Sequence, residues 1–531
     1  MSFKKQIVKN IMSNYMLNFI GMFLGFLLIP FLVKKLGQEA FGLTVLAEST
    51  IIFFEIATIS VRIALSRHAT FALAQKKMDD FIEYLSTGRF ILFFSTILVF
   101  IGGSLLSYYF PVVFKVPAVY SAQSKILFFL ITVAFSISVL AIVFWSVLYA
   151  KQRYDLINIS SSIGRIVRAA LIFILFSLLP PKFISLSTYG FVFLAMICME
   201  NFMVYWWCKR VMPGIQISMM RFKKEKVKDI LSFSAHTSVT RISFLLYHNT
   251  ANILINLFWG AGFNAIYGIS LKIPLIMERL FLATSWTLAP TFTDLVAKND
   301  RRRFKMLFFM YTKLITVITA PILLLIVCMA QPIISLWVGD EMNLAGKVLL
   351  IHIVPLFVTV PFAVCGCITT AYAKVKIPSR VNLGSAILNI ALILFLTKFF
   401  NLQLFGIAIA SSSSRFLASA LFASYYACKV SNISLKKYLI GSFVAPFLWV
   451  GLIMGGCFAI IYSLQSNFSF SLISILLLSV FTVICYGGAY KIVLSEEERY
   501  HIRDIIGAFL KGFYSSKIQK IKSIGNPVGS R

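Results

Sequence analysis

The chain has 531 residues, of which 59% are hydrophobic and only 13% are charged, whereas soluble domains carry about 25% charged residues. This composition, which includes 52 phenylalanines, excludes a soluble enzyme, a disordered chain and a secreted disulfide-stabilised domain. The net charge of +31 comes from basic residues that lie mostly in short segments between apolar runs, which indicates a membrane protein and not a nucleic-acid-binding protein.

Fourteen apolar runs are long enough to span a bilayer, which takes about 20 residues. The first run follows Lys4, Lys5 and Lys9 and is too long for the apolar part of a signal peptide, so we expect it to be retained as a helix. The sequence therefore predicts an all-α polytopic membrane protein. The predicted membrane helices are 11–33, 43–65, 89–110, 124–150, 156–179, 185–207, 229–257, 264–290, 306–330, 345–370, 381–400, 405–428, 438–464 and 468–490.

The distribution of Lys and Arg predicts the orientation of these helices. With both termini in the cytoplasm, the inner segments hold 35 basic residues and the outer segments hold 7. Positive residues are retained on the cytoplasmic side of membrane proteins, so this bias predicts cytoplasmic termini and an even number of helices.

Two short matches within the sequence indicate an internal repeat. Leu148 begins a Leu-Tyr-Ala-Lys segment that resembles the Ala-Tyr-Ala-Lys segment at Ala371, 223 residues later. Phe41-Gly42 resembles Tyr267-Gly268, 226 residues later. Nearly equal offsets predict two six-helix halves in the same orientation, and transporters built in this way bind their substrate between the halves.

This repeat predicts four regions along the chain. After about Leu494, apolar residues at helical spacing alternate with Lys and Arg, which favours a helix lying on the inner membrane surface over a frayed basic tail. The regions are an N-terminal bundle of residues 1–210, a C-terminal bundle of 211–430, an appended helix pair of 431–494 and a cytoplasmic basic amphipathic tail of 495–531.

Three predicted helices carry ionisable residues at seven-residue spacing. A charged side chain inside a bilayer costs about 2.5–3.5 kcal/mol on insertion scales, so each one indicates a function or a partner. Seven residues return to nearly the same face of a helix. The residues are Glu48, Glu55 and Arg62 on 43–65, Arg241 and His248 on 229–257, and Lys272, Glu278 and Arg279 on 264–290.

If these three helices face one another, their side chains line one water-filled cleft with an excess of positive charge. Arg and Lys bind phosphate through charge-assisted hydrogen bonds, so the cleft predicts an anionic cargo such as a phosphate or pyrophosphate. The alternative is that the basic groups pair with the carboxylates and hold the helices together. The predicted substrate-binding residues are Arg62, Arg241, Lys272 and Arg279, and the candidates for charge balance or ion coupling are Glu48, Glu55, His248 and Glu278.

Three further arginines are secondary candidates for substrate binding. Arg165 and Arg168 lie three residues apart on the 156–179 helix and therefore share a face. Arg415 follows four serines on the 405–428 helix, and these serines are explained by close helix packing alone.

Motifs of catalysis are missing from the sequence. There is no Gly-x-x-x-x-Gly-Lys phosphate-binding loop and no His-Glu-x-x-His metal motif. We therefore predict no catalytic residue, no metal site and no cofactor, and favour transport, coupled to protons or sodium or to no ion.

A set of short motifs in a fixed order is similar to a known family. The motifs are Ile29-Pro30, Leu36-Gly37-x-Glu39-x-Phe41-Gly42, Arg62 with Arg67, Tyr149-Ala150-Lys151, and Tyr267-Gly268 with Lys272-Ile273-Pro274. Over the first twelve predicted helices the chain resembles the polysaccharide-transporter branch of the multidrug/oligosaccharidyl-lipid/polysaccharide exporter superfamily, and above all the O-antigen flippases.

This resemblance implies two six-helix bundles around a central cavity in the bacterial inner membrane. It also implies that undecaprenyl-pyrophosphate-linked oligosaccharide is flipped across that membrane, with glycan polymerase and assembly proteins as further partners. Many relatives carry an Asp near the position of His248, where this sequence reads Tyr247-His248-Asn249, so ion coupling would use Glu55 or His248. A multidrug exporter of the same fold and a membrane-embedded glycan polymerase or glycosyltransferase remain alternatives.

Overall fold

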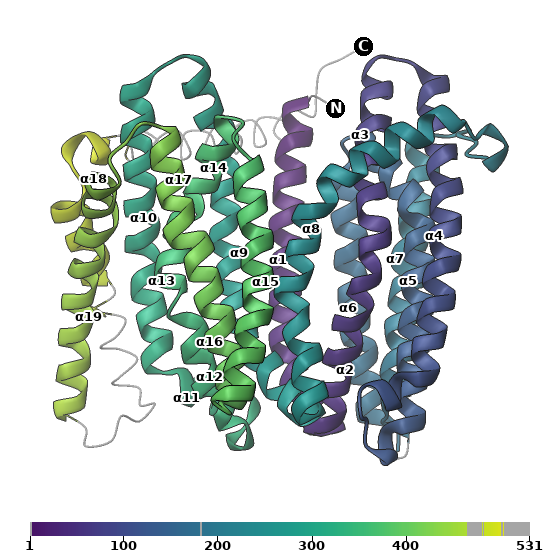
Figure 1. Ribbon diagram of the computed structural model, residues 1–531, viewed down its shortest axis with the longest axis horizontal. Helices are drawn as coiled ribbons and strands as arrows, with labels where there is room; N and C mark the ends of the chain where they lie inside the picture. Colours follow the sequence, from purple (N-terminus) through teal and green to yellow (C-terminus); the bar gives the residue numbers. More distant parts are fainter. Residues whose placement is uncertain (1–2, 181–182, 465–479, 482, 501–502, 504–531) are drawn as a thin grey trace, which may run out of the picture. The chain divides into compact units, whose positions relative to one another are not determined.

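The computed structural model describes residues 3–180, 183–464, 480–481, 483–500 and 503. Every regular element in these ranges is a helix, which confirms the predicted all-α class (Figure 1). The longest helices are α1 (Phe3–Leu36), α3 (Ile56–Ala74), α4 (Met78–Val113), α5 (Ser121–Ala150), α6 (Tyr154–Leu178), α7 (Leu186–Val211), α8 (Lys224–Trp259), α9 (Ala261–Ala297), α10 (Arg301–Cys328), α15 (Lys376–Phe399) and α19 (Ala445–Leu464).

Shorter helices complete the described part of the chain. Some are turns or π-helical stretches that continue a longer helix, such as the 3-10 turn η1 (Ile52–Glu55) between α2 and α3. They are α2 (Gln38–Ile51), η2 (Ala118–Tyr120), η4 (Met219–Arg221), α11 (Ala330–Val338), η5 (Asp340–Met342), α12 (Asn343–Ile353), α13 (Leu356–Thr359), η6 (Pro361–Ala363), α14 (Val364–Ala371), α16 (Gln403–Arg415), η7 (Phe416–Phe422), α17 (Ala423–Val430), α18 (Leu435–Leu439), η8 (Ile440–Val444) and η9 (Ala489–Val493).

Within the described residues, ten helical segments are long and apolar enough to cross a membrane, so the protein is a multi-pass membrane protein. These ten match ten of the fourteen predicted helices, and the full count of fourteen is not confirmed. The predicted 43–65, 229–257 and 264–290 helices form as α2–η1–α3, α8 and α9 but are not among the ten. They are the helices that carry the ionisable stripes. Most of the predicted 468–490 helix lies outside the described residues.

The contacts divide the chain into two compact units. Unit 1 comprises 1–276, 333–352 and 376–418, and unit 2 comprises 277–332, 353–375 and 419–531. Because α9 runs from one unit into the other, these units differ from the predicted bundles, whose boundaries at 210, 430 and 494 stay a prediction.

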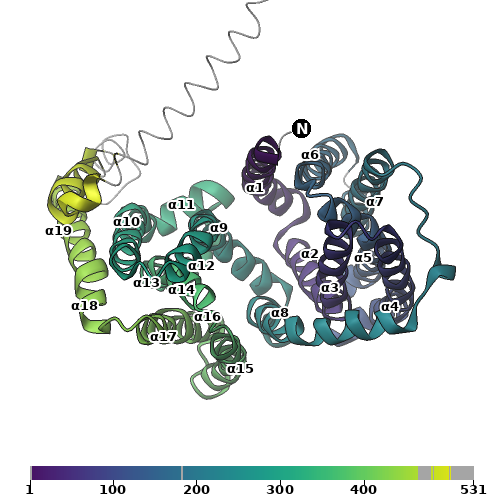
Figure 2. The ribbon, with the colours of Figure 1, turned by 90° about the horizontal axis from the view of Figure 1, so that it is seen from above.

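Unit 1 has its apolar core among the helices of the first third of the chain. Helix α5 packs against α4, α7 and α3, with fully buried residues such as Phe81, Leu85, Leu92 and Val147 between them. Viewed from above, α5 lies among α3, α4 and α7 (Figure 2). Small residues allow this close packing, since a Cβ on Gly103 would collide with the side chain of Thr132.

The carboxyl-terminal part of α1 is fixed by an aromatic contact. Pro30 has no N–H to donate to the carbonyl of Phe26 in the preceding turn. The indole Nε1 of Trp337 in α11 donates to that carbonyl at 2.7 Å, and the rings of Phe26 and Trp337 stack at 4.7 Å. Unit 1 therefore supplies from α11 the hydrogen bond that the proline removes.

A pair of glycines marks equivalent points in the predicted repeat. Gly37 before α2 and Gly260 before α9 have φ of 85° and 89°, a backbone conformation that favours glycine. They lie 223 residues apart, the same offset as the Leu148 and Ala371 segments. Phe41 and Tyr267, in contrast, are the fourth residue of α2 and the seventh of α9, so this match does not fall at equivalent helix positions.

Unit 2 is organised around Tyr438 of α18, which is fully buried. Its ring stacks on Phe308 of α10 at 4.3 Å, and its hydroxyl lies 2.8 Å from that of Thr312. Near the end of the described chain, Glu498 pairs with Lys313 of α10 at 3.0 Å. Lys313 thus has a carboxylate partner within its own unit.

Candidate functional site

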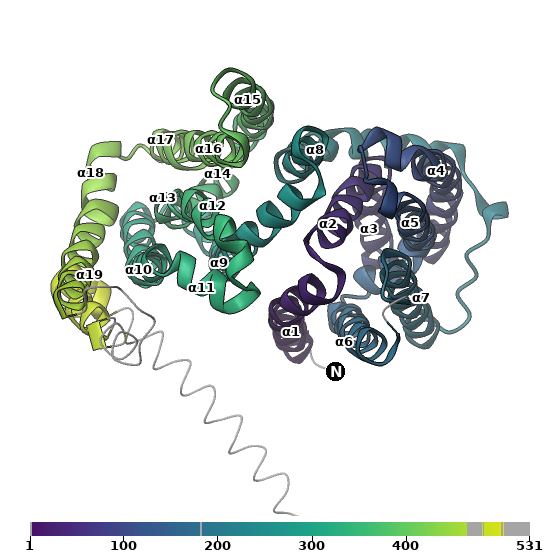
Figure 3. The same ribbon diagram turned by 90° about the horizontal axis from the view of Figure 1, so that it is seen from below.

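Helix α6 carries a polar stripe along its length in unit 1. Asp155, Asn158, Ser161, Arg165 and Arg168 follow one another at intervals of three or four residues, which places them along one side of a helix. The helix packs against α1 and α7, which lie beside it in the views from above and below (Figures 2 and 3). Polar side chains on a membrane-spanning helix are expected to form hydrogen bonds or ion pairs with those neighbouring helices.

At the amino-terminal end of the stripe, Asp155 joins α1 to α6. Its carboxylate is fully buried and lies 2.8 Å from the amino group of Lys9 and 3.0 Å from Nε of Arg153. The amide of Gln6 also donates to it at 2.8 Å, and Asn10 Oδ1 accepts from its backbone N–H. Two basic groups and the Gln6 amide therefore compensate the cost of burying this carboxylate.

In the middle of the stripe, Arg165 reaches from α6 to the backbone of α1. Its Nη1 donates to the carbonyl of Leu17 at 3.1 Å, and a Cβ on Gly21 would collide with its guanidinium. One turn earlier, the hydroxyl of Ser161 donates to Glu200 of α7. The absence of a side chain at Gly21 thus leaves the room that Arg165 occupies.

Four helices bring charged and aromatic groups together around Arg168. Its Nη2 donates to Glu48 Oε1 of α2 at 2.6 Å and also to the Tyr189 hydroxyl of α7, which itself donates to Glu48 at 2.7 Å. The guanidinium lies about 5 Å from the ring centroids of Tyr189 and Phe193. Lys272 of α9 also interacts electrostatically with Glu48. We call Glu48, Arg168, Tyr189 and Lys272 the α2–α6 cluster.

The α2–α6 cluster combines internal pairing with access from outside. The side chain of Glu48 is 37% exposed and that of Arg168 is 22% exposed. Two basic groups act on the one carboxylate, so these residues carry a net charge of +1. A carboxylate and basic groups in contact can hold helices together, bind an anion or exchange an ion with water.

Some of the site residues predicted from the sequence lie together in the α2–α6 cluster. Glu48 and Lys272, expected on facing stripes, do interact, and Arg168, a secondary candidate, is the direct partner of Glu48. Glu48 is thus paired with a basic group inside unit 1. Arg62 lies in α3 with its Nη2 3.8 Å from Glu55 Oε1, a long contact between partly exposed groups.

The other predicted residues are not part of the cluster as the structure describes it. The side chains of Arg241 and His248 lie outside the described residues, although both positions belong to α8. Glu278 and the exposed Arg279 belong to unit 2. Arg415 ends α16 in unit 1. The predicted cleft between these residues stays a prediction.

Sequence reasoning missed Tyr189 and Phe193, whose rings flank the guanidinium of Arg168. Tyrosine and phenylalanine in an apolar run are usually packing residues. Nothing in the sequence around Tyr189 and Phe193 therefore indicates that they lie beside a charged group. The three-residue and four-residue spacing of polar residues from Asp155 to Arg168 is the signal that could have identified the stripe. Among the described residues, no three His, Cys, Asp or Glu side chains group as a metal site would require.

Comparison with known families agrees with this architecture. The family model described as "Polysaccharide biosynthesis protein" matches residues 7–296. This chain belongs to that family. The MatE family model matches residues 237–395. Membership places the chain in the polysaccharide and lipid-linked flippase branch of the exporter superfamily, which confirms the predicted resemblance.

Individual proteins with a similar sequence or fold cover 77% to 91% of the length of this family member. The uncharacterized membrane protein EpsK of Bacillus subtilis (strain 168) is 23% identical over 479 residues, which are 89% of this chain and 92% of EpsK. An inward-facing multidrug resistance MATE family transporter has a TM-score of 0.66 at 11% identity, covering 77% of this chain and 96% of its own. The lipid II flippase MurJ, in an inward closed conformation, has a TM-score of 0.63 at 16% identity, covering 91% and 99%. These structures share the fold with this member of the polysaccharide biosynthesis protein family.

Proposed function

We propose that this protein flips an undecaprenyl-pyrophosphate-linked oligosaccharide, such as an O-antigen repeat unit or a similar surface glycan precursor, across the bacterial inner membrane. Alternating access of two bundles to a central cavity carries the cargo. Membership of the polysaccharide biosynthesis protein family and the MurJ fold support a lipid-linked cargo.

The observation that carries this proposal is the charge of the α2–α6 cluster. Arg168 and Lys272 act together on the Glu48 carboxylate and leave an excess of one positive charge among groups that are partly exposed. A cationic group in the membrane part of a protein is stabilised when it contacts an anion, and a pyrophosphate headgroup supplies that anion. We infer that Lys272 contacts the headgroup, since Arg168 is already bound on two sides by Glu48 and Tyr189.

Arg62, Arg241 and Arg279 complete the proposed pyrophosphate-binding set, with Glu55, His248 and Glu278 balancing charge or coupling an ion. Arg241→Ala or Arg279→Ala should abolish surface glycan while leaving membrane abundance near normal, because each removes one of the cations proposed to bind the pyrophosphate. Glycan display is measured by gel staining of surface polysaccharide in a deletion strain that expresses each variant.

The control is Lys34→Ala, an exposed cation in the last turn of α1, which should leave glycan display intact. Unchanged display in both arginine variants would exclude the proposed pyrophosphate site. Deleting the gene should trap lipid-linked repeats on the inner leaflet, detected by their resistance to a glycosidase added from outside.

Export of drugs by the same fold is a second candidate, favoured by the MatE match and the multidrug transporter neighbour. Cargo of that kind is commonly cationic and would be repelled by the net charge of the α2–α6 cluster. A deletion strain that becomes sensitive to cationic dyes while its surface glycan is unchanged would favour this second function.

A further inference from the structure

The end of α7, the connection to α8 and the start of α8 form a strongly basic segment with an exposed methionine. We call residues 209–228 the basic turn. Six of its basic residues are exposed, against one acidic residue, Glu225. The exposed basic residues are Lys209, Arg210, Arg221, Lys223, Lys224 and Lys228.

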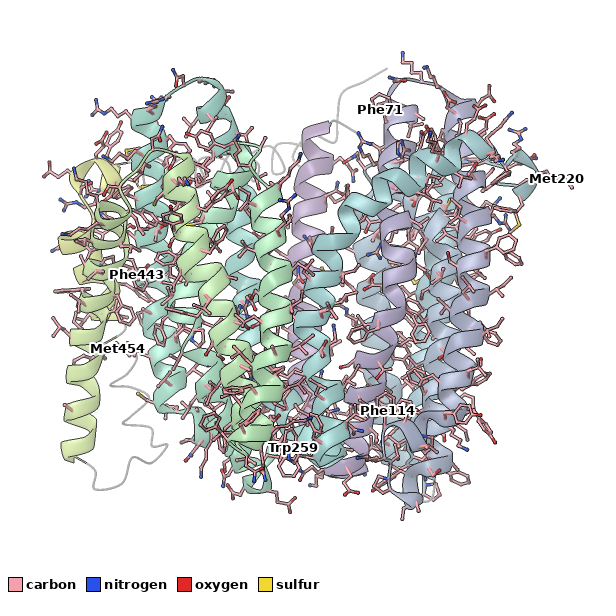
Figure 4. All side chains as sticks on the ribbon, viewed as in Figure 1. Phe71, Phe114, Met220, Trp259, Phe443 and Met454 are labelled. Carbon is pink, nitrogen blue, oxygen red and sulfur yellow. The ribbon has the colours of Figure 1, made fainter. Side chains whose placement is uncertain are left out.

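Met220 protrudes from the 3-10 turn η4 in the middle of this segment. Its side chain is 96% exposed, although methionine is normally buried. The labelled side chain lies at the edge of the molecule, away from the helices of unit 1 (Figure 4). It is followed directly by the exposed Arg221, so an apolar group and a positive charge are presented side by side.

The exposure of Met220 is imposed by the structure around it. Arg89 of α4 donates to the carbonyl of Ile217 at 2.6 Å, and Thr87 Oγ1 accepts from the backbone N–H of Lys223 at 3.1 Å. Between these two hydrogen bonds, the ring of Phe222 packs on that of Phe90 of α4, with the ring centroids 4.4 Å apart. The chain is therefore fixed to α4 on both sides of Met220, and Met220 is held outward between these contacts.

The direction in which the basic turn projects indicates which surface it contacts. In the side view and in both axial views it extends sideways from the bundle, beyond α4, and not along the helix axes (Figures 1, 2 and 3). Near the end of α7, Trp206 and Tyr205 are exposed, and Arg210 lies 4.5 Å over the Trp206 ring. Exposed Trp and Tyr beside Arg mark the level of lipid headgroups in membrane proteins. A segment that extends sideways at this level lies over lipid.

We propose that the basic turn binds the anionic headgroups of the surrounding leaflet, with Met220 inserted among the upper acyl chains. Arg221, Lys223 and Lys224 then contact lipid phosphates, and the turn anchors the start of α8 to the membrane surface. Charge complementarity and the adjacent methionine favour a lipid surface over a soluble acidic partner, which would not require an apolar side chain in this position. This inference does not depend on the identity of the cargo.

The test uses the full chain with its native cysteines replaced and a single Met220→Cys carrying a bimane fluorophore. The protein is reconstituted into phosphatidylcholine vesicles with or without phosphatidylglycerol. Quenching by a lipid with a nitroxide near its headgroup reports membrane contact, and quenching by iodide reports exposure to water. Phosphatidylglycerol should raise the ratio of lipid to iodide quenching by about threefold, and added salt should reverse the rise.

A matched control and a charge variant make the result specific. Val119 of η2 is 79% exposed, and a bimane at Val119→Cys should show no dependence on phosphatidylglycerol. Neutralising Arg221, Lys223 and Lys224 to Gln should abolish the rise at Met220, with thermal unfolding unchanged because all three are exposed. Equal quenching with and without phosphatidylglycerol, or full access of iodide in both, would overturn the proposal.

Discussion

Residue by residue, the most informative contact is the one between Arg168 and Glu48. The two side chains come from positions 120 residues apart and share Tyr189 as a third partner. A charge held in this way satisfies the hydrogen-bonding capacity of its neighbours, so its loss affects more than one bond. The cluster is therefore expected to stabilise the fold and to set the charge that the cargo meets.

Removing Arg168 should destabilise the protein by about 2 kcal/mol, since it leaves the Glu48 carboxylate without its main partner. Arg168→Ala is compared with Glu48→Gln and with the double variant by thermal unfolding in detergent. The double variant should be more stable than Arg168→Ala alone, because the unpaired carboxylate is gone. Strictly additive losses would show that the two residues do not interact.

At the scale of single helices, the packing of α2 against α9 depends on how closely their backbones approach. Gly42 of α2 faces the amino-terminal turn of α9, where an added Cβ would collide with the carbonyl of Ala261. Asn264 donates to the carbonyl of Gly42 at 3.4 Å, and Gln38 donates to that of Gly262 at 3.0 Å. The starts of α2 and α9 thus cross at a contact that only glycine permits.

Gly42→Ala should force α2 and α9 apart and lower both thermal stability and glycan display. The obstacle is a backbone atom, which cannot rotate away as a side chain can. Gly25→Ala in α1 is the matched control, since no atom lies within 4 Å of its added Cβ, and it should be neutral. Equal behaviour of the two variants would contradict the crossing.

The start of α8 is fixed to α4 by Lys226, which lies 2.5 Å from Asp80 and 2.8 Å from Glu83. Burial favours the neutral amine, but the hydrogen bonds to these carboxylates outweigh it and raise the pKa of Lys226. The amino group therefore stays charged, and its contribution is lost only when the pH rises through this raised pKa.

Lys226→Met should loosen the start of α8, because Asp80 and Glu83 lose their shared cation. Hydrogen exchange of peptides covering residues 215–230 should become at least about threefold faster, which corresponds to a fraction of a kcal/mol. Lys228→Met, an exposed lysine on the same turn, should leave exchange unchanged. Equal exchange in both variants would mean that Lys226 does not hold the two helices together.

For the whole molecule, the bias of 35 against 7 basic residues predicts which ends of the helices face the cytoplasm. Val119 then lies outside and Met220 inside. In intact cells without other reactive cysteines, a membrane-impermeant maleimide should label Val119→Cys and not Met220→Cys. The opposite labelling would invert the topology and place the basic turn on the outer surface.

Much of the membrane architecture follows from composition alone. Ten predicted spans are matched by helices long and apolar enough to cross a bilayer, because a run of apolar residues in lipid must satisfy its backbone hydrogen bonds within a helix. Three further predicted spans form helices too. The resemblance to the polysaccharide-transporter branch, based on short motifs in order, is confirmed by the family match.

The sequence by itself determined the class of protein, most of its helices and the residues whose burial requires a reason. Only the tertiary structure decided which residues contact one another. Arg168 pairs with Glu48, and Arg165 binds the backbone of Leu17. Trp337 donates to the Phe26 carbonyl, which receives no hydrogen bond from Pro30. Hydropathy and spacing are properties of one helix at a time. Contacts between helices depend on how each is rotated and how closely small residues let it approach, and a linear pattern does not specify either.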